Sequence, residues 1–172
     1  MALIKTIEKD QGDEIVKQIF ESFEQSSGSV PEWVKVMAHR PRILKEFIDL
    51  FNSIMIEQGA IEPLLKWKIG YVVSQTLKCK FCVDVTGKML KKLGADDELL
   101  KKIKELESEN EKEKEVLALV KDVTLDGYLD QPEILDKLKT MLSEGELVEV
   151  VSVIGLFNYI NRFNNTFAIL PE

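Results

Sequence analysis

The sequence predicts an all-α protein, a multihelical bundle of about eight to nine helices with no sheet. Apolar residues recur with the 3.6-residue period of a helix in nearly every segment, and no run alternates as a half-buried strand does. Proline and glycine stand where helices begin and end. The 172 residues suffice for one well-buried domain. We expect a single helical domain with an N-terminal helix and linker (1–29), a half that carries both cysteines (30–110) and a C-terminal helical half (111–172).

The expected helices span residues 14–23, 33–37, 42–57, 63–77, 79–93, 96–106, 116–125, 132–142 and 147–167. The first is amphipathic and ends at the breaker sequence Ser26-Ser27-Gly28-Ser29. Pro31 and Pro41 each open the next helix, since proline suits the first helical turn. Gly59 predicts the end of the third helix.

The middle of the chain follows the same rules. Gly94 predicts the end of the helix that starts at the cysteines, and Asp96 is an N-cap residue for the helix after it. Residues 105–115 are almost entirely Glu, Lys, Ser and Asn, which predicts a solvated connection and helix start. A turn at Asp126-Gly127 precedes the helix that begins at Pro132.

The last helix begins at a capping box, Ser143-Glu144-Gly145-Glu146. Its apolar residues cover most of its circumference, so we expect burial on several sides, one of them against another subunit. Polar residues interrupt it near its end: Asn158, Asn161, Arg162, Asn164 and Asn165. Buried amides need hydrogen-bond partners, so this cluster should line a polar contact or a pocket.

Composition excludes several classes of protein. A net charge of −7, with no basic patch interleaved with aromatic residues, argues against nucleic acid and anionic membranes as partners. The N-terminus lacks the pattern of a secretory signal, and no uninterrupted apolar run reaches about 18 residues. We expect a cytoplasmic protein.

The chain has two cysteines, in Cys79-Lys80-Phe81-Cys82. On a helix, residues i and i+3 share a face, and a slight tightening brings their Cβ atoms within disulfide range. A helix N-terminus at the pair, together with the positive charge of Lys78 and Lys80, should favour a thiolate. This spacing therefore indicates a reversible dithiol, and Cys82 and Cys79 are the candidate catalytic residues.

Three other interpretations remain open for the pair. A structural disulfide would close a very short loop and would gain little stability. A zinc site needs four ligands, and the chain offers two cysteines and one distant histidine, His39, so we expect no metal. The cysteines could also be buried and inert.

Several segments resemble a known family. The order His39-Arg40-Pro41, Ile43 to Phe47, Gly59, the 66–77 helix and the CxxC pair, followed by Leu156 to Arg162, is similar to the alkylhydroperoxidase D-like (AhpD-like) branch of the carboxymuconolactone decarboxylase superfamily. The resemblance covers about residues 30–168. It implies an all-helical fold, a dimer, trimer or hexamer, and thiol-dependent reduction of a peroxide or disulfide substrate by a dithiol reductant without a cofactor. It makes Cys82 peroxidatic and Cys79 resolving.

The sequence departs from the family's pattern at two positions. Where the family carries a glutamate and a histidine that relay protons, this chain has Trp67 and Thr86. Neither side chain titrates near neutral pH, so we expect a weakened peroxidase. Thr86 could still donate a hydrogen bond to the Cys82 thiolate. Thr86, Trp67 and Lys80 are the predicted supporting residues of the site.

Other polar residues near the pair are weaker candidates. Lys68, Glu62 and Asp84 are predicted to lie at the surface. His39 is interpreted as a structural residue at a helix junction, and Trp67 as core.

Three functions therefore remain open. The first is a thiol oxidoreductase of the AhpD-like peroxidase type. The second is a catalytically degenerate oligomeric scaffold that has lost its proton relay. The third is a binding protein whose assembly responds to oxidation of Cys79 and Cys82.

Overall fold

The computed structural model describes residues 2–129 and 132–171, and all regular structure in these ranges is helical, which confirms the predicted fold class. The α-helices are α1 (Glu14–Ser27), α2 (Glu32–Met37), α3 (Pro41–Phe51), α4 (Pro63–Thr76), α5 (Lys80–Lys92), α6 (Asp97–Lys104), α7 (Glu111–Asp126), α8 (Pro132–Lys139) and α9 (Glu144–Thr166). A short 3₁₀ helix, η1 (Lys9–Gln11), precedes them, and a π-helical segment, η2 (Asn52–Ile56), continues α3.

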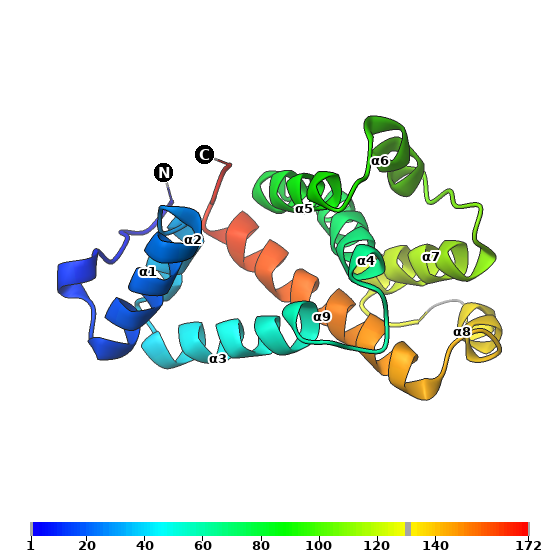
Figure 1. Cartoon of the computed structure of the whole chain (residues 1–172), viewed down its shortest axis with the longest axis horizontal. Coiled ribbons are helices and arrows are strands. Elements are labelled where there is room, and N and C mark those ends of the chain that lie inside the picture. The colour runs from blue at the N-terminus through cyan, green and yellow to red at the C-terminus, as the bar shows by residue number, and fades with distance from the viewer. Residues whose placement is uncertain (1, 130–131, 172) are drawn as a thin grey trace.

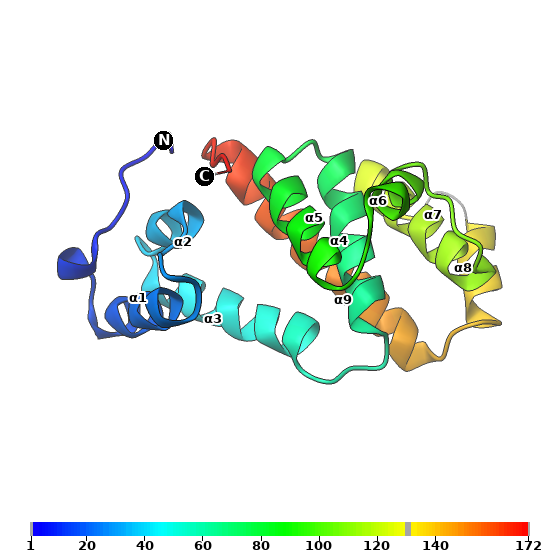
Figure 2. The ribbon, with the colours of Figure 1, turned by 45° about the horizontal axis from the view of Figure 1, so that its top comes forward.

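Helix α4 is the centre of the bundle. It packs against α5, α7 and α9, and every residue from Lys66 to Ser74 is buried. A helix buried on all sides has no polar face, which explains its lack of amphipathic pattern. Helix α9 runs past α4 from the α8 corner towards the chain termini, and α1 to α3 form a separate layer at one end (Figures 1 and 2).

The helix ends follow the predicted signals. Side chains of Asp13, Asp96, Asn110 and Ser143 accept N-cap hydrogen bonds, and the Ser143–Glu146 capping box is formed in both directions. Left-handed glycines follow α1, α5 and α7, at Gly28, Gly94 and Gly127. Within residues 2–129 and 132–171, no helix combines the length and apolar character that crossing a bilayer requires.

Two sequence predictions need correction. The helix expected over residues 42–57 changes to π-helical geometry at Asn52. The run 105–115 contains the predicted helix start, at Glu111, but it is only partly solvated. Glu113 binds the buried Lys68, and Glu115, which is 8% exposed, binds Lys137. Two of the charges that suggested a solvated segment are therefore used in tertiary contacts.

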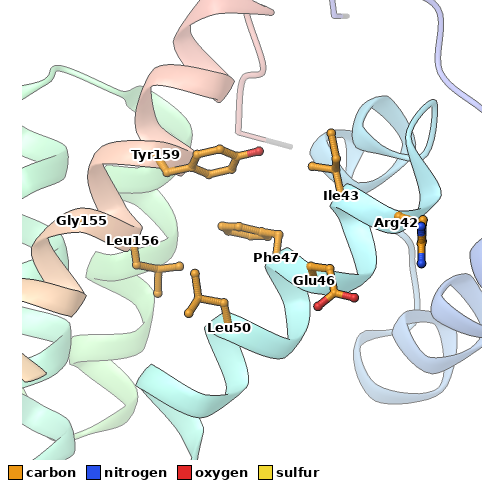
Figure 3. Close-up of a pocket in the computed structure, with 8 residues that line it drawn as sticks. All are labelled: Arg42, Ile43, Glu46, Phe47, Leu50, Gly155, Leu156 and Tyr159. Carbon is orange, nitrogen blue, oxygen red and sulfur yellow. The ribbon is translucent and has the colours of Figure 1, made fainter.

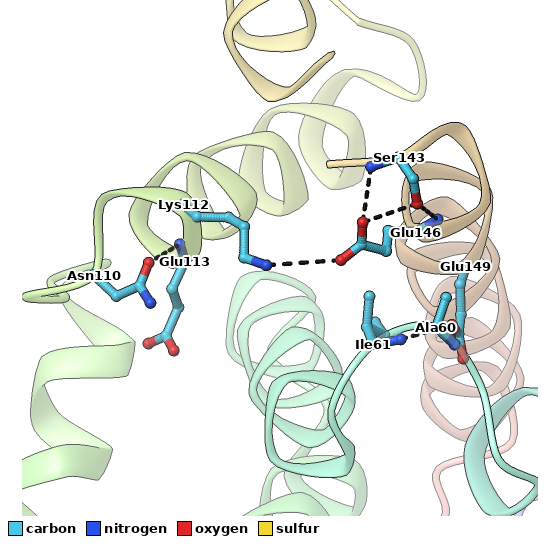
Figure 4. Close-up of polar contacts among 8 residues, drawn as sticks. All are labelled: Ala60, Ile61, Asn110, Lys112, Glu113, Ser143, Glu146 and Glu149. Atoms are coloured by element: carbon cyan, nitrogen blue, oxygen red, sulfur yellow. Dashed lines mark hydrogen bonds and ion pairs between the residues drawn. The ribbon is translucent and has the colours of Figure 1, made fainter. Parts of the chain in front are cut away.

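One carboxylate fastens the loop between α3 and α4 to α9 (Figure 4). Glu149 accepts hydrogen bonds from the backbone N–H groups of Ala60 and Ile61 and forms an ion pair with Lys66 at 2.5 Å. Lys66, only 2% exposed, also donates to the carbonyl oxygen of Ile54 at 2.7 Å. A Cβ at Gly59 would overlap this carboxylate, so a larger residue there would displace the Glu149 side chain. The loop is thus held by a buried charge pair.

Candidate functional site

The two cysteines lie where α4 ends and α5 begins. Lys78 adopts the left-handed conformation with φ 55°, Cys79 N–H donates to the Ser74 carbonyl at 3.1 Å, and Lys78 N–H donates to Gln75 at 3.2 Å. These bonds form a Schellman motif, which ends α4 abruptly. Cys79 therefore becomes the N-cap residue of α5, and Cys82 lies within the first turn.

The two sulfur atoms face one another. Cys79 Sγ and Cys82 Sγ are 3.1 Å apart, both thiols are free, and the residues are 0% and 4% exposed. A disulfide of about 2.05 Å needs an approach of only about 1 Å from this geometry. The predicted CxxC pair is thus in position for reversible oxidation.

The two thiols of the pair differ in pKa. The hydrogen bond with Cys82, helped by backbone N–H groups of Cys82 and Phe81 at the helix N-terminus and opposed by burial, lowers the pKa of Cys79 to about 7. The same contact with Cys79, and then burial, raise the pKa of Cys82. The pair therefore loses one proton near neutral pH and retains the second.

A side chain from α9 completes the surroundings of the sulfurs. Asn164 is fully buried, and its Nδ2 donates a hydrogen bond to Cys82 Sγ at 3.3 Å. This contact lowers the pKa of Cys82, opposing the larger effects of Cys79 and burial. One residue later, Asn165 Nδ2 donates to the carbonyl oxygen of Leu77 at 2.9 Å. The amides predicted to line a contact or a pocket thus hold the α4–α5 junction.

An apolar pocket of about 530 Å³ reaches Cys82. Its rim includes the exposed serines of α1, and its inner end is formed by buried residues beside the thiol. The aromatic residues that line it are Phe23, Trp33, Phe47, Phe51, Trp67, Phe81 and Phe157. A pocket of this size and apolar lining is typical of small-molecule sites.

The three predicted supporting residues, Trp67, Thr86 and Lys80, differ in whether they line the pocket at Cys82. Trp67 lines the pocket and packs edge-on against Phe51 and Phe157, so it is both core and pocket wall. Thr86 also lines the pocket, but its hydroxyl donates to the carbonyl oxygen of Cys82 at 2.7 Å. The hydrogen bond that the sequence suggested from Thr86 to the Cys82 thiolate is therefore not formed. Lys80 is exposed at the first position of α5.

The weaker candidates have structural contacts. Lys68 was expected at the surface, but it is 6% exposed and binds both oxygens of Glu113 at 2.8 Å. Asp84 pairs with Lys88 on the outer face of α5. His39 Nε2 is 2.8 Å from the carbonyl oxygen of Lys5, a structural contact as expected. Among the described residues, no three His, Cys, Asp or Glu side chains gather as metal ligands.

A second hollow lies between α3 and α9 (Figure 3). Its volume is about 570 Å³, and the exposed Ile43 and Leu50 line it with Tyr159. Phe47 lines both hollows and stacks on Tyr159 with ring centroids 5.3 Å apart. Through Phe47, this side of α9 borders the pocket that contains the thiol.

The sequence predicted the two thiols but not the residues that form the pocket around Cys82. Asn164 was noticed only as part of a polar cluster, and nothing in the sequence linked it to Cys82. The pocket aromatics have the spacing of ordinary core residues. Only the tertiary arrangement, in which residues of α1 and α3 share a cavity with residues of α4 and α5, turns that core pattern into a pocket.

No family model matches the sequence. Over 118 residues, the chain is 28% identical to the uncharacterized protein YnjA of Escherichia coli K12, and the match spans 66% of this chain and 64% of that protein. The match therefore covers slightly less than two thirds of the length of this relative.

Solved structures share the whole fold. A peroxidase-related protein from Ralstonia eutropha JMP134, described as an alkylhydroperoxidase AhpD core, has a TM-score of 0.88 at 16% identity, covering 99% of this chain and 92% of that one. A peroxidase-related protein from Silicibacter sp. TM1040 has a TM-score of 0.82 at 21% identity, covering 94% and 88%. The debrominase Bmp8 has a TM-score of 0.84 at 22% identity, covering 99% and 92%. The chain therefore has the AhpD-like fold that its sequence resemblance implied.

Proposed function

We propose that this protein is a thiol-dependent oxidoreductase in which Cys82 attacks the substrate and Cys79 resolves the intermediate. The observation that carries the proposal is the pair of reduced thiols, 3.1 Å apart, at the inner end of an apolar pocket. Peroxidase-related proteins that share the fold support the same chemistry. A substrate of this class is an organic hydroperoxide with an apolar body.

Access favours Cys82 as the nucleophile. Cys82 lines the pocket, whereas Cys79 is completely buried behind it. The pKa of Cys79, about 7, then suits a different role, because its thiolate can accept the proton of Cys82 as that sulfur attacks. The first cysteine thus serves as the base that the absent relay would have supplied.

The steps balance. The sulfur of Cys82 attacks the terminal oxygen of the hydroperoxide, the O–O bond breaks, and the products are an alcohol and a sulfenic acid on Cys82. Cys79, which took the proton of Cys82, passes it to the departing alkoxide and becomes a thiolate again. This thiolate then attacks the sulfur of Cys82, and the displaced hydroxide takes from solvent the proton that Cys79 had lost earlier and leaves as water. Two thiols and one hydroperoxide give one alcohol, one water and the Cys79–Cys82 disulfide. A dithiol reductant restores the thiols by exchange.

The rate of hydroperoxide reduction should be low for an enzyme of this fold. Trp67 and Thr86 occupy the positions where the resemblance implies a glutamate and a histidine, and neither transfers protons near neutral pH. Loss of general acid–base assistance costs roughly 10²–10⁴-fold in rate. The proton acceptor remaining beside Cys82 is Cys79.

We also propose that the protein is a homo-oligomer. The hollow between α3 and α9 is lined by exposed apolar side chains (Figure 3), and α9 continues this surface at Val148 and Val151. Exposed apolar patches of this kind mark contact surfaces between proteins. Light scattering would detect the assembly, and a monomer at micromolar concentration would contradict it.

The test of the proposed function uses cumene hydroperoxide with purified, reduced protein and intact-mass measurement. One equivalent should convert the wild type to a species about two daltons lighter, the loss of two hydrogens, with release of one equivalent of 2-phenyl-2-propanol. Cys79→Ser should accumulate sulfenic acid on Cys82, and Cys82→Ser should consume no hydroperoxide.

The two cysteine variants serve as controls for each other. Hydroperoxide consumption by Cys82→Ser at the wild-type rate would exclude Cys82 as the nucleophile. Sulfenic acid on Cys79 in that variant would reverse the assigned roles. Two unmodified thiols in the wild type would leave the scaffold hypothesis as the better description.

Reductive dehalogenation is a second candidate function. It is favoured by the fold shared with the debrominase Bmp8, a variant of which was solved in complex with 2,3,4-tribromopyrrole, and by the apolar pocket at Cys82. A bromoarene and two thiols would give the arene, bromide, a proton and a disulfide. Incubation of the reduced protein with 2,3,4-tribromopyrrole, with bromide release measured, tests this function separately from peroxide reduction.

A further inference from the structure

The pocket at Cys82 contains no formal charge. None of its lining residues is Asp, Glu, Lys, Arg or His, and its side chains are aromatic, aliphatic, amide, hydroxyl or thiol. An ionised ligand would lose its hydration there without gaining a partner. The site therefore suits a neutral molecule, and the seven aromatic side chains suit one with a ring.

One buried polar atom of a residue that lines the pocket lacks a partner. Asn164 uses its Nδ2 to donate to Cys82, while its Oδ1 is buried and accepts no hydrogen bond among the described residues. Buried carbonyl oxygens almost always have a donor, and because Asn164 lines the pocket, a ligand bound there can supply the missing one.

We propose, on the basis of the thiol chemistry proposed above, that Asn164 determines substrate specificity. Its carbonyl oxygen accepts a hydrogen bond from an O–H or N–H group next to the atom that Cys82 attacks, and the aromatic walls bind a neutral ring. In a hydroperoxide with an aromatic body, the donor is the O–H group itself. One amide then binds both reactants, with its N–H on the sulfur and its oxygen on the substrate.

A neighbouring asparagine provides a matched control. Asn161 lies one turn earlier in α9, is equally buried, and also has an unpaired Oδ1. Its Nδ2 donates to the carbonyl oxygen of Phe157 at 2.7 Å, and it does not line the pocket. The same substitution at both positions therefore separates loss of a buried amide from loss of the acceptor in the pocket.

The experiment measures binding without any reaction. Both tryptophans of the chain, Trp33 and Trp67, line the pocket, so intrinsic fluorescence reports occupancy. Reduced protein is titrated with 2-phenyl-2-propanol and with its methyl ether, which keeps the ring and the oxygen but lacks the donor. The wild type should bind the alcohol roughly three- to tenfold more tightly, the value of one net hydrogen bond.

The preference for the alcohol should disappear in Asn164→Leu and persist in Asn161→Leu. Asn164→Ala provides a second variant if the larger side chain prevents folding, which circular dichroism reports. Equal affinity for the alcohol and the ether in the wild type, or a preference that survives both Asn164 variants, would overturn the proposal.

The binding measurement is independent of the proposed function. Selective binding of the alcohol by a protein that does not reduce cumene hydroperoxide would retain the role of Asn164 and reject the redox activity. Reduction of the hydroperoxide with no preference for the alcohol would retain the redox activity and reject the role of Asn164.

Discussion

The side-chain amide of Asn164 in α9 donates a hydrogen bond to the sulfur of Cys82 in α5, across a sequence separation of 82 residues. A donor to a thiolate stabilises its charged form, so this contact lowers the pKa of Cys82. The contact joins the C-terminal helix to the thiol chemistry of the first half of the chain.

Asn164→Leu should raise the pKa of Cys82 and slow its alkylation. In a Cys79→Ser background, which leaves one thiol, we expect the rate of reaction with iodoacetamide at pH 7.5 to fall roughly three- to tenfold. Asn161→Leu in the same background should react at the parent rate. An unchanged rate in the Asn164 variant would show that its hydrogen bond does not stabilise the thiolate.

Stability of the reduced protein should pass through a maximum with pH. The pKa of Cys79 is about 7 in the folded protein, below the ordinary thiol value of about 8.5, while that of Cys82 is raised. Between these values, the unfolded chain binds one more proton than the folded chain, so stability rises with pH. Above about 8.5 the unfolded chain loses both protons, and stability falls.

Urea denaturation with a non-thiol reductant at pH 6.5, 7.5, 8.5 and 9.5 measures this effect. The variant with both cysteines changed to alanine should lack the maximum. A wild-type curve parallel to that of the double variant at all four values would contradict the assigned pKa values.

Gly70→Ala should damage the pocket by displacing Phe157. A Cβ on Gly70 would lie 2.5 Å from ring atoms of Phe157, which lines the pocket and packs on Trp67. We expect about 1–3 kcal/mol of destabilisation from overpacking, together with weaker binding of 2-phenyl-2-propanol.

Gly87→Ala is the matched control for this substitution. A Cβ on Gly87, in α5, meets only Tyr71 at an ordinary 3.7 Å. Alanine in a helix interior is favoured over glycine by about 0.5–1 kcal/mol, so this variant should be more stable than the wild type. Thermal melts that place both variants on the same side of the wild type would contradict the packing argument.

Glu149→Gln should destabilise the protein by about 3 kcal/mol, because it leaves the ammonium group of the buried Lys66 without its counter-charge. Asp49→Asn removes the partner of Lys45 in an exposed ion pair, where both side chains are about half exposed, and should destabilise the protein far less than Glu149→Gln does. Urea unfolding of both variants compares the pairs directly. Equal small losses would mean that the α3–α4 loop does not depend on the Lys66–Glu149 pair.

The predicted helix boundaries that held depend on local chemistry. Ser143 and Glu146 form the capping box that their spacing predicts, and Gly28 ends α1 in the left-handed conformation. These interactions involve residues within one turn of each other, so neighbouring sequence contains the information. Where distant partners intervene, the prediction failed. The charged run predicted that Glu113 is solvated, but in the folded protein Glu113 forms an ion pair with Lys68.

The sequence by itself determined the helical class and the existence of a CxxC pair whose sulfurs share one face, because helix periodicity and the i, i+3 spacing are local properties. The tertiary structure decided what the pair can react with. Only the fold brings α1, α3 and α9 around the α4–α5 region to form an uncharged pocket at Cys82, and only the fold brings Asn164 to the sulfur. Contacts between segments far apart in the chain leave no periodic signal, so pocket shape and thiol environment had to be read from the folded molecule.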